Sequence, residues 1–328
     1  MVHYIGKRLL IIIPLLLVLS VVVFVLIQLP PGDYLTSYIN TLRAQGGNID
    51  QDTIQQLEMR YGLDQPMYIQ YFKWMGRMFQ GDFGYSFQWN RPVNELLADR
   101  LPCTIALSFT SILLVWIIAL PIGFYSATHK YSPLDYGFTT ISFLGMSLPD
   151  FLLALIVLWL YYAATGTFGG GLYSDAFVNQ PFSFAKFVDL LKHVWMPYLV
   201  IAITSTAGLI KTFRANLLDE MSKPYVQTAR AKGVSNLRLL IKYPVRIAMI
   251  PFVSTIGWML PGLISGQTII SIVMNLPTVG PLLLNALKNQ DMYLAGSIVF
   301  ILGVLTMIGT LISDILLALT DPRIRRKG

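Results

Sequence analysis

The sequence predicts an all-α integral membrane protein with six transmembrane helices and both termini in the cytoplasm. Of its 328 residues, 55% are hydrophobic and only 12% are charged, whereas a soluble domain averages about 25% charged residues. Several apolar runs reach the ~20 residues that a helix needs to cross a bilayer. Backbone polar groups in lipid must be satisfied within their own segment, so these runs should be helices.

The six predicted spans follow the longest apolar runs in chain order. The first run is too long for the core of a signal peptide, and no small-x-small cleavage site follows it, so we expect it to be retained. The spans are expected near Leu9–Leu29, Thr104–Thr128, Tyr136–Thr165, Val194–Thr212, Ile247–Leu276 and Tyr293–Leu319.

The distribution of charge orients these spans. The N-terminus, the short loop around His129, the loop 211–246 and the C-terminus together carry 15 of the 24 Lys and Arg residues. The other three loops are longer in total, yet they carry nine basic residues and 11 of the 17 acidic ones. The positive-inside rule then places both termini in the cytoplasm. The net charge of +7 therefore reflects the orientation of the chain in membrane lipid, and we expect no nucleic-acid partner.

Residues for chemistry are scarce, so we expect neither an enzyme nor a bound metal or cofactor. Cys103 is the sole cysteine, and the three histidines lie far apart in the chain, which gives no metal-ligand spacing. The sequence has no G-x-x-x-x-G-K-[ST] loop for nucleotide phosphates and no G-x-S-x-G or H-E-x-x-H motif. Energy for any transport must therefore come from a partner.

The 70 residues after the first span predict a small extracytoplasmic helical subdomain. Asp52 is placed to cap one helix, with Ile54, Leu57 and Tyr61 on one face. A second helix should begin near Pro66 and end at Gly81. Its apolar residues recur at helical spacing, which favours a local core, with contact to another protein as the alternative. These residues are Tyr68, Phe72, Met75 and Phe79.

The most informative loop lies between Lys211 and Arg246, with eight basic residues and the acids Asp219 and Glu220. Pro224 is suited to start a helix, and the small residues up to Gly233 permit close approach to a groove on another protein. The alternative is an amphipathic helix on acidic lipid. The segment is short and has no broad apolar face, which favours docking.

Two acids lie within predicted spans, where ionisable residues are functional candidates. Asp150 follows Ser147-Leu148-Pro149, a sequence expected to open the helix, and it suits either a structural role or the transport pathway. Asp314 is near the inner end of the last span, where hydration or pairing with a tail arginine would satisfy it. Neither acid belongs to a chain of titratable groups, which argues against proton coupling.

Span five carries a polar face at steps of three or four residues, which fall on one side of a helix. That face either lines a translocation path or packs against another helix. Gly262 and Gly266 form a G-x-x-x-G on nearly the opposite side, suited to close helix packing. The polar face comprises Ser254, Gly257, Pro261, Ser265, Thr268, Ser271 and Asn275. The candidate pathway residues are Asp150 and the members of this face other than Ser254.

A set of motifs in fixed order resembles the peptide-type permease subunits of binding-protein-dependent ABC importers. The central one is Tyr225-Val226-Gln227-Thr228-Ala229-Arg230-Ala231-Lys232-Gly233, which resembles the loop that engages the ATPase. The others are Pro31-Gly32-Asp33, Gly62-Leu63-Asp64-Gln65-Pro66, Gly81-Asp82-Phe83-Gly84-Tyr85-Ser86, Arg100-Leu101-Pro102 and Asp321-Pro322-Arg323.

The resemblance implies a type I importer permease fold in the plasma membrane of a prokaryote. It implies a second homologous permease, two cytoplasmic ABC ATPase subunits or domains, and an extracytoplasmic solute-binding protein. The chain would divide into 1–29, an outer subdomain 30–103, and a permease core 104–328 with the coupling loop 211–246. The implied ATPase-coupling residues are Glu220, Tyr225, Val226, Thr228, Ala229, Arg230, Ala231, Lys232 and Gly233.

The sequence departs from the family pattern at two places. Gln227-Thr228-Ala229 stands where importers generally have Glu-Ala-Ala, and Ser271 stands where the peptide subgroup has Glu. The second departure leaves the solute open between oligopeptides or dipeptides, which we expect, and oligosaccharides. An ion-coupled secondary carrier is the alternative of another class, but it would need intramembrane charges and usually an internal repeat.

Overall fold

The computed structural model describes residues 2–28, 65–86, 88–178, 180–250, 252–253 and 267–320, and this part is mostly helical. Within it, four helices are long and apolar enough to cross a membrane. They are α1 (Val2–Gln28), α5 (Val93–Thr128), α8 (Phe184–Met221) and α14 (Met292–Thr320). The chain is thus an all-α membrane protein, as predicted.

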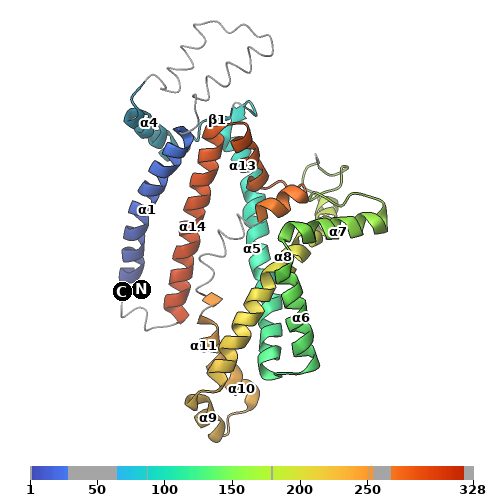
Figure 1. The fold of residues 1–328 in the computed structure, drawn as a ribbon. Coiled ribbons are helices and arrows are strands. Elements are labelled where there is room, and N and C mark those ends of the chain that lie inside the picture. The colour runs from blue at the N-terminus through green and yellow to red at the C-terminus, as the bar shows by residue number, and fades with distance from the viewer. Residues whose placement is uncertain are drawn as a thin grey trace.

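The long helices form two groups (Figure 1). Helices α1 and α14 pack side by side in opposite directions, so α1 begins at the end where α14 finishes. Helix α5 packs along α8, and α6 (Pro133–Ser147) and α7 (Asp150–Thr165) also contact α8. The largest apolar cluster lies among α5, α7 and α8, where Val115, Met196 and Val200 are fully buried.

Helices α5 and α8 extend well beyond the spans predicted from apolar runs. Helix α5 begins eleven residues before Thr104, because Val93, Leu96 and Leu97 pack into a cluster with the outer helix α13 (Val279–Lys288) and α14. Helix α8 has 38 residues and is therefore about 57 Å long, whereas the hydrocarbon core is ~30 Å thick. It is therefore long enough to extend beyond the hydrocarbon core.

The third predicted span, Tyr136–Thr165, is broken rather than continuous. Helices α6 and α7 meet at an angle of 104°. The break falls at Leu148 and Pro149, where Leu148 is extended with ψ 132°, because a residue before proline is disfavoured in the helical conformation. The two helices count as one span at most.

The count of six spans stays a prediction, because most of the fifth span lies outside the described residues. Residues 254–266 are not described, so Gly262 and Gly266 cannot be placed. On the near side of that gap, α9 (Pro224–Ala231) and α10 (Asn236–Leu240) are followed by a π-helical turn, η1 (Ile241–Val245), and α11 (Arg246–Ala248). On its far side the chain is helical over 267–273.

The second helix of the outer segment forms where the sequence predicts it. Helix α4 (Met67–Phe79) follows Pro66 and ends before Gly81, whose φ is +79°. The predicted core face was wrong for three of its four residues, because Tyr68, Phe72 and Phe79 are 65%, 69% and 83% exposed, whereas Met75 is partly buried. The buried face is the neighbouring one, since Trp74 and Met78 face α1 and α14 instead. The predicted helix over residues 54–61 lies outside the described residues.

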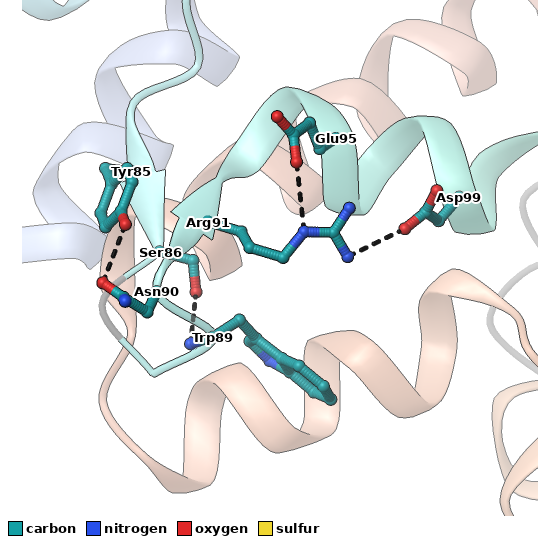
Figure 2. Close-up of polar contacts among 7 residues, drawn as sticks. All are labelled: Tyr85, Ser86, Trp89, Asn90, Arg91, Glu95 and Asp99. Atoms are coloured by element: carbon teal, nitrogen blue, oxygen red, sulfur yellow. Dashed lines mark hydrogen bonds and ion pairs between the residues drawn. The ribbon is translucent and has the colours of Figure 1, made fainter.

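A short hairpin links α4 to α5 on the outer side (Figure 2). Its strands are β1 (Tyr85–Ser86) and β2 (Arg91–Pro92), which pair antiparallel. The Ser86 hydroxyl donates a hydrogen bond to the buried carboxylate of Asp291, just before α14. On the exposed side, Arg91 reaches Glu95 at 3.1 Å and Asp99 at 3.2 Å.

Candidate coupling site

The part of loop 211–246 that follows α8 folds into a unit at the end of that helix, with α9 and α10 at its tip (Figure 1). Helix α9 has Pro224 in its first turn, as predicted, since this position needs no backbone donor. It ends at Ala231, two residues before Gly233, which adopts φ +77° and donates its N–H to the carbonyl of Arg230 at 3.0 Å. This left-handed conformation explains why glycine is required there.

The predicted coupling residues divide between two faces of α9. Val226 and Ala229 are buried against Leu239 of α10. The outward residues are Thr228, Arg230, Ala231, Lys232 and Gly233, all of them exposed. The inward residues therefore fix the shape of the unit, and the outward residues remain accessible to another protein.

Glu220 anchors α9 to the end of α8. Its carboxylate is largely buried and accepts a hydrogen bond of 2.6 Å from the Tyr225 hydroxyl, and it also contacts the Lys223 ammonium. Lys223 lies 3.3 Å from Asp219 as well. Burial and the nearby Glu220 raise the pKa of Tyr225, so this phenol stays protonated and donates. Glu220 and Tyr225 thus couple the two helices within the chain.

Two apolar side chains next to α9 escaped prediction. Leu237 on α10 is 63% exposed, and Ile241, one turn further along, is 56% exposed. Their i, i+4 spacing places them on one helix face. An apolar pair exposed on a basic cytoplasmic loop is the composition of a protein-docking surface. The spacing of Leu237 and Ile241 can be read from the sequence, but the sequence analysis considered only the basic residues of this loop.

The candidate pathway residues lie near the break before α7 and in the chain around 267–275. Asp150 is the first residue of α7, where the positive end of the helix dipole stabilises a carboxylate. Thr268 lies against Gly280 of α13, and Ser271 is fully buried, whereas Asn275 is exposed with φ +53°. The remaining candidates, Gly257, Pro261 and Ser265, lie outside the described residues.

A buried polar contact that the sequence analysis missed joins α5 to this segment. The Ser108 hydroxyl donates to the carboxamide oxygen of Gln267 at 3.3 Å, and both side chains are buried. The amide nitrogen of Gln267 and the hydroxyl of Ser271 have no hydrogen-bond partner in the part of the chain that the structure describes. Buried polar groups are normally satisfied by protein or ordered water, so this region has capacity to bind water.

Asp314 pairs with an arginine near the N-terminus, whereas the sequence analysis named an arginine of the C-terminal tail. Its carboxylate lies 3.0 Å from the Arg8 guanidinium of α1. The contact links the cytoplasmic halves of α1 and α14. The tail arginines named in the prediction lie outside the described residues.

Comparison with known sequences identifies the family to which the chain belongs. Residues 119–326 match the family described as the binding-protein-dependent transport system inner membrane component, and residues 1–108 match the N-terminal region of such membrane components. The chain belongs to this permease family. It is therefore a subunit of an ABC importer in the cell membrane, and the resemblance seen in the sequence is confirmed.

Relatives of this permease extend over its full length. The oligopeptide transport system permease protein AppB of Bacillus subtilis is 36% identical over 325 residues, 99% of each chain. The oligopeptide transport system permease protein OppB of Haemophilus influenzae is 29% identical over 326 residues, 99% of this chain and 100% of that one.

A solved structure agrees with the fold. The inward-facing MetNI methionine ABC transporter matches with a TM-score of 0.53 and 15% identity, over 69% of this permease and 96% of that chain.

Proposed function

We propose that this permease forms one half of a translocation pore for oligopeptides or dipeptides. A solute-binding protein would deliver the peptide on the outer side, and a second homologous permease would complete the pore. The observation that supports the peptide solute is the full-length similarity to permeases named for oligopeptide transport.

ATP binding and hydrolysis on two cytoplasmic ATPase subunits or domains would drive the pore through α9. Three features support this role. The unit of α9 and α10 lies at the far end of a helix too long for the membrane alone. Its outward face carries Arg230 and Lys232, and the exposed apolar pair Leu237 and Ile241 lies beside it. Apolar anchors with a charged rim are the usual composition of a protein interface.

The translocation path is proposed to run along the polar face of span five. Its residues would be Gly257, Pro261, Ser265, Thr268, Ser271 and Asn275, with Asp150 at the break between α6 and α7. Ser271 and Thr268 are packed within the subunit, so their exposure to the path would need a second conformation. Alternating access supplies such a second conformation in transporters.

The coupling role is tested by Arg230→Glu and Gly233→Val in the complete transporter, coexpressed with its partner subunits. A β-branched residue is strained at the φ of Gly233, and the new charge would repel an acidic partner surface. We expect ATPase copurification to fall by about tenfold or more, which corresponds to 1.4 kcal/mol or more. Peptide uptake into vesicles should fall with it.

Matched controls are Lys130→Glu, a charge reversal on the same side of the membrane, and Gly137→Val on α6. Lys130 is exposed, and a side chain at Gly137 would meet nothing within 4 Å. Both controls should retain the ATPase. Wild-type copurification in the two α9 variants would disprove the docking role, and binding of saccharides instead of peptides by the cognate solute-binding protein would disprove the peptide assignment.

A further inference from the structure

A buried ion pair ties α8 to the turn between α5 and α6, far along the chain. The Arg214 guanidinium donates from Nε to Oδ1 of Asp135 at 3.0 Å and from Nη2 to Oδ2 at 2.8 Å. Asp135 is 2% exposed. This two-pronged geometry fixes both the distance and the relative orientation of the groups.

The same carboxylate also organises the turn. It accepts the backbone N–H of Tyr131 at 2.9 Å, and the backbone N–H of Asp135 donates to the cap hydroxyl of Ser132 at 3.2 Å. Tyr131 has φ +66°. Three donors therefore converge on Asp135, and the end of α5, the start of α6 and the Arg214 side chain are held by one group.

Arg214 lies on the path from α9 into the membrane. Glu220, which holds Tyr225 of α9, is six residues further along α8, or about 9 Å along the helix axis. Between them, Leu217 is fully buried in a cluster with Ala127 of α5. A displacement of α9 would therefore move Glu220, the end of α8 and Arg214 as one rigid body.

We infer that Asp135 and Arg214 are positioning residues that transmit the displacement of α9 to α5 and α6. This inference rests on the proposed coupling role of α9. Without the pair, α5 and α6 would still pack against α8, but the charged link that fixes the α5–α6 turn to Arg214 would be lost, so the turn would follow α8 less closely. Helix α6 leads directly to the break at Pro149 and to α7, so the motion would reach the outer half of the membrane region.

The test uses Asp135→Asn, Arg214→Lys and the double variant in the complete transporter. Three quantities are measured: ATPase copurification, stimulation of ATP hydrolysis by solute-loaded binding protein, and peptide uptake per ATP hydrolysed. We expect normal copurification and basal hydrolysis, with stimulation and uptake per ATP reduced about tenfold in Asp135→Asn, within the range of typical coupling effects. The double variant should be no worse than Asp135→Asn, because both changes cut one link.

Arg214→Lys keeps the charge but loses the fork geometry, so it should retain an intermediate stimulation. The matched control is Lys211→Gln, one turn away on α8. Its ammonium lies 5.5 Å from the ring centre of Phe143 and pairs with no carboxylate among the described residues. It should behave as wild type.

Wild-type stimulation and uptake in all three variants would overturn the inference. So would an equal loss of complex yield, basal hydrolysis and stimulation, because that pattern reports folding alone. Failure of the docking proposal gives a different result, namely ATPase copurification that survives Arg230→Glu. The two failures are therefore distinguishable.

Discussion

The two ends of the permease each contain a deeply buried carboxylate, and the two are neutralised in different ways. On the cytoplasmic side, Asp135 is 2% exposed and meets the Arg214 guanidinium in a two-pronged ion pair. On the outer side, Asp291 is 1% exposed and receives a hydroxyl from Ser86 and the backbone N–H of Leu294 at 3.3 Å. Within the described residues, one carboxylate is paired with a cation, and the other accepts hydrogen bonds from uncharged donors.

Because their partners differ, the Asp135 and Asp291 contacts are suited to different roles. An ion pair between helices resists separation strongly, because parting it would leave two charges in a poorly solvated place. A carboxylate held by dipoles keeps its full desolvation cost, and burial accordingly raises the pKa of Asp291. The inner contact is therefore suited to carry force, and the outer one to hold the hairpin in register with α14.

The largest effect is expected from Asp135→Ala. The change leaves Arg214 without its carboxylate and removes the acceptor of the Tyr131 N–H. Breaking a fully buried pair costs about 3–5 kcal/mol, and the partial exposure of Arg214 reduces this to about 2–3 kcal/mol. Thermal unfolding of the purified transporter in detergent checks it. A Tm equal to that of wild type would show that the Asp135 carboxylate contributes no more to stability than a surface carboxylate.

A smaller loss of Tm is expected from Asp291→Ala, and a small gain of Tm from Asp291→Asn. Alanine leaves the Ser86 hydroxyl and the Leu294 N–H without their acceptor, which costs about 1–3 kcal/mol. Asparagine keeps an acceptor oxygen and carries no charge to desolvate. Tm measurements on both variants at neutral pH compare them. If asparagine is as harmful as alanine, the negative charge itself is required.

The outer carboxylate also predicts a pH dependence with a definite sign. Because its folded pKa is raised, Asp291 binds its proton more tightly in the folded protein than in the unfolded chain. Its ionised form therefore opposes folding above the raised pKa, and this cost disappears as the pH falls toward the unfolded value of about 3.9. The Tm difference between Asp291→Asn and wild type should shrink over that window. A difference that grows on acidification would contradict the assignment.

The smallest effect is expected from Arg91→Gln, a change to ion pairs in solvent. Arg91 contacts Glu95 and Asp99 on the exposed side of the hairpin (Figure 2). Exposed pairs contribute little because water and salt screen them, so we expect no measurable change in Tm. A loss as large as that of Asp291→Ala would mean that the exposed pairs, and not the buried hydrogen bonds, hold the hairpin.

The amino-acid sequence was enough to predict the membrane class, the approximate positions of the four long helices and helix α9. These depend on local signals: runs of apolar residues, the sign of loop charges, Pro224 at a helix start and Gly233 after its end. Each signal acts over about one helix, so neighbouring residues suffice to predict it. The family resemblance depended on the same short motifs.

Which of the polar groups meet depends on how the helices pack. Asp135 and Arg214 are 79 residues apart in the chain, and Ser86 and Asp291 are 205 apart, so no local pattern pairs them. The inward face of α9 and the buried face of α4 were settled in the same way, by the helix that each packs against. Periodicity shows that a helix has an apolar face, but packing chooses among faces of similar hydrophobicity, because burial depends on what lies opposite.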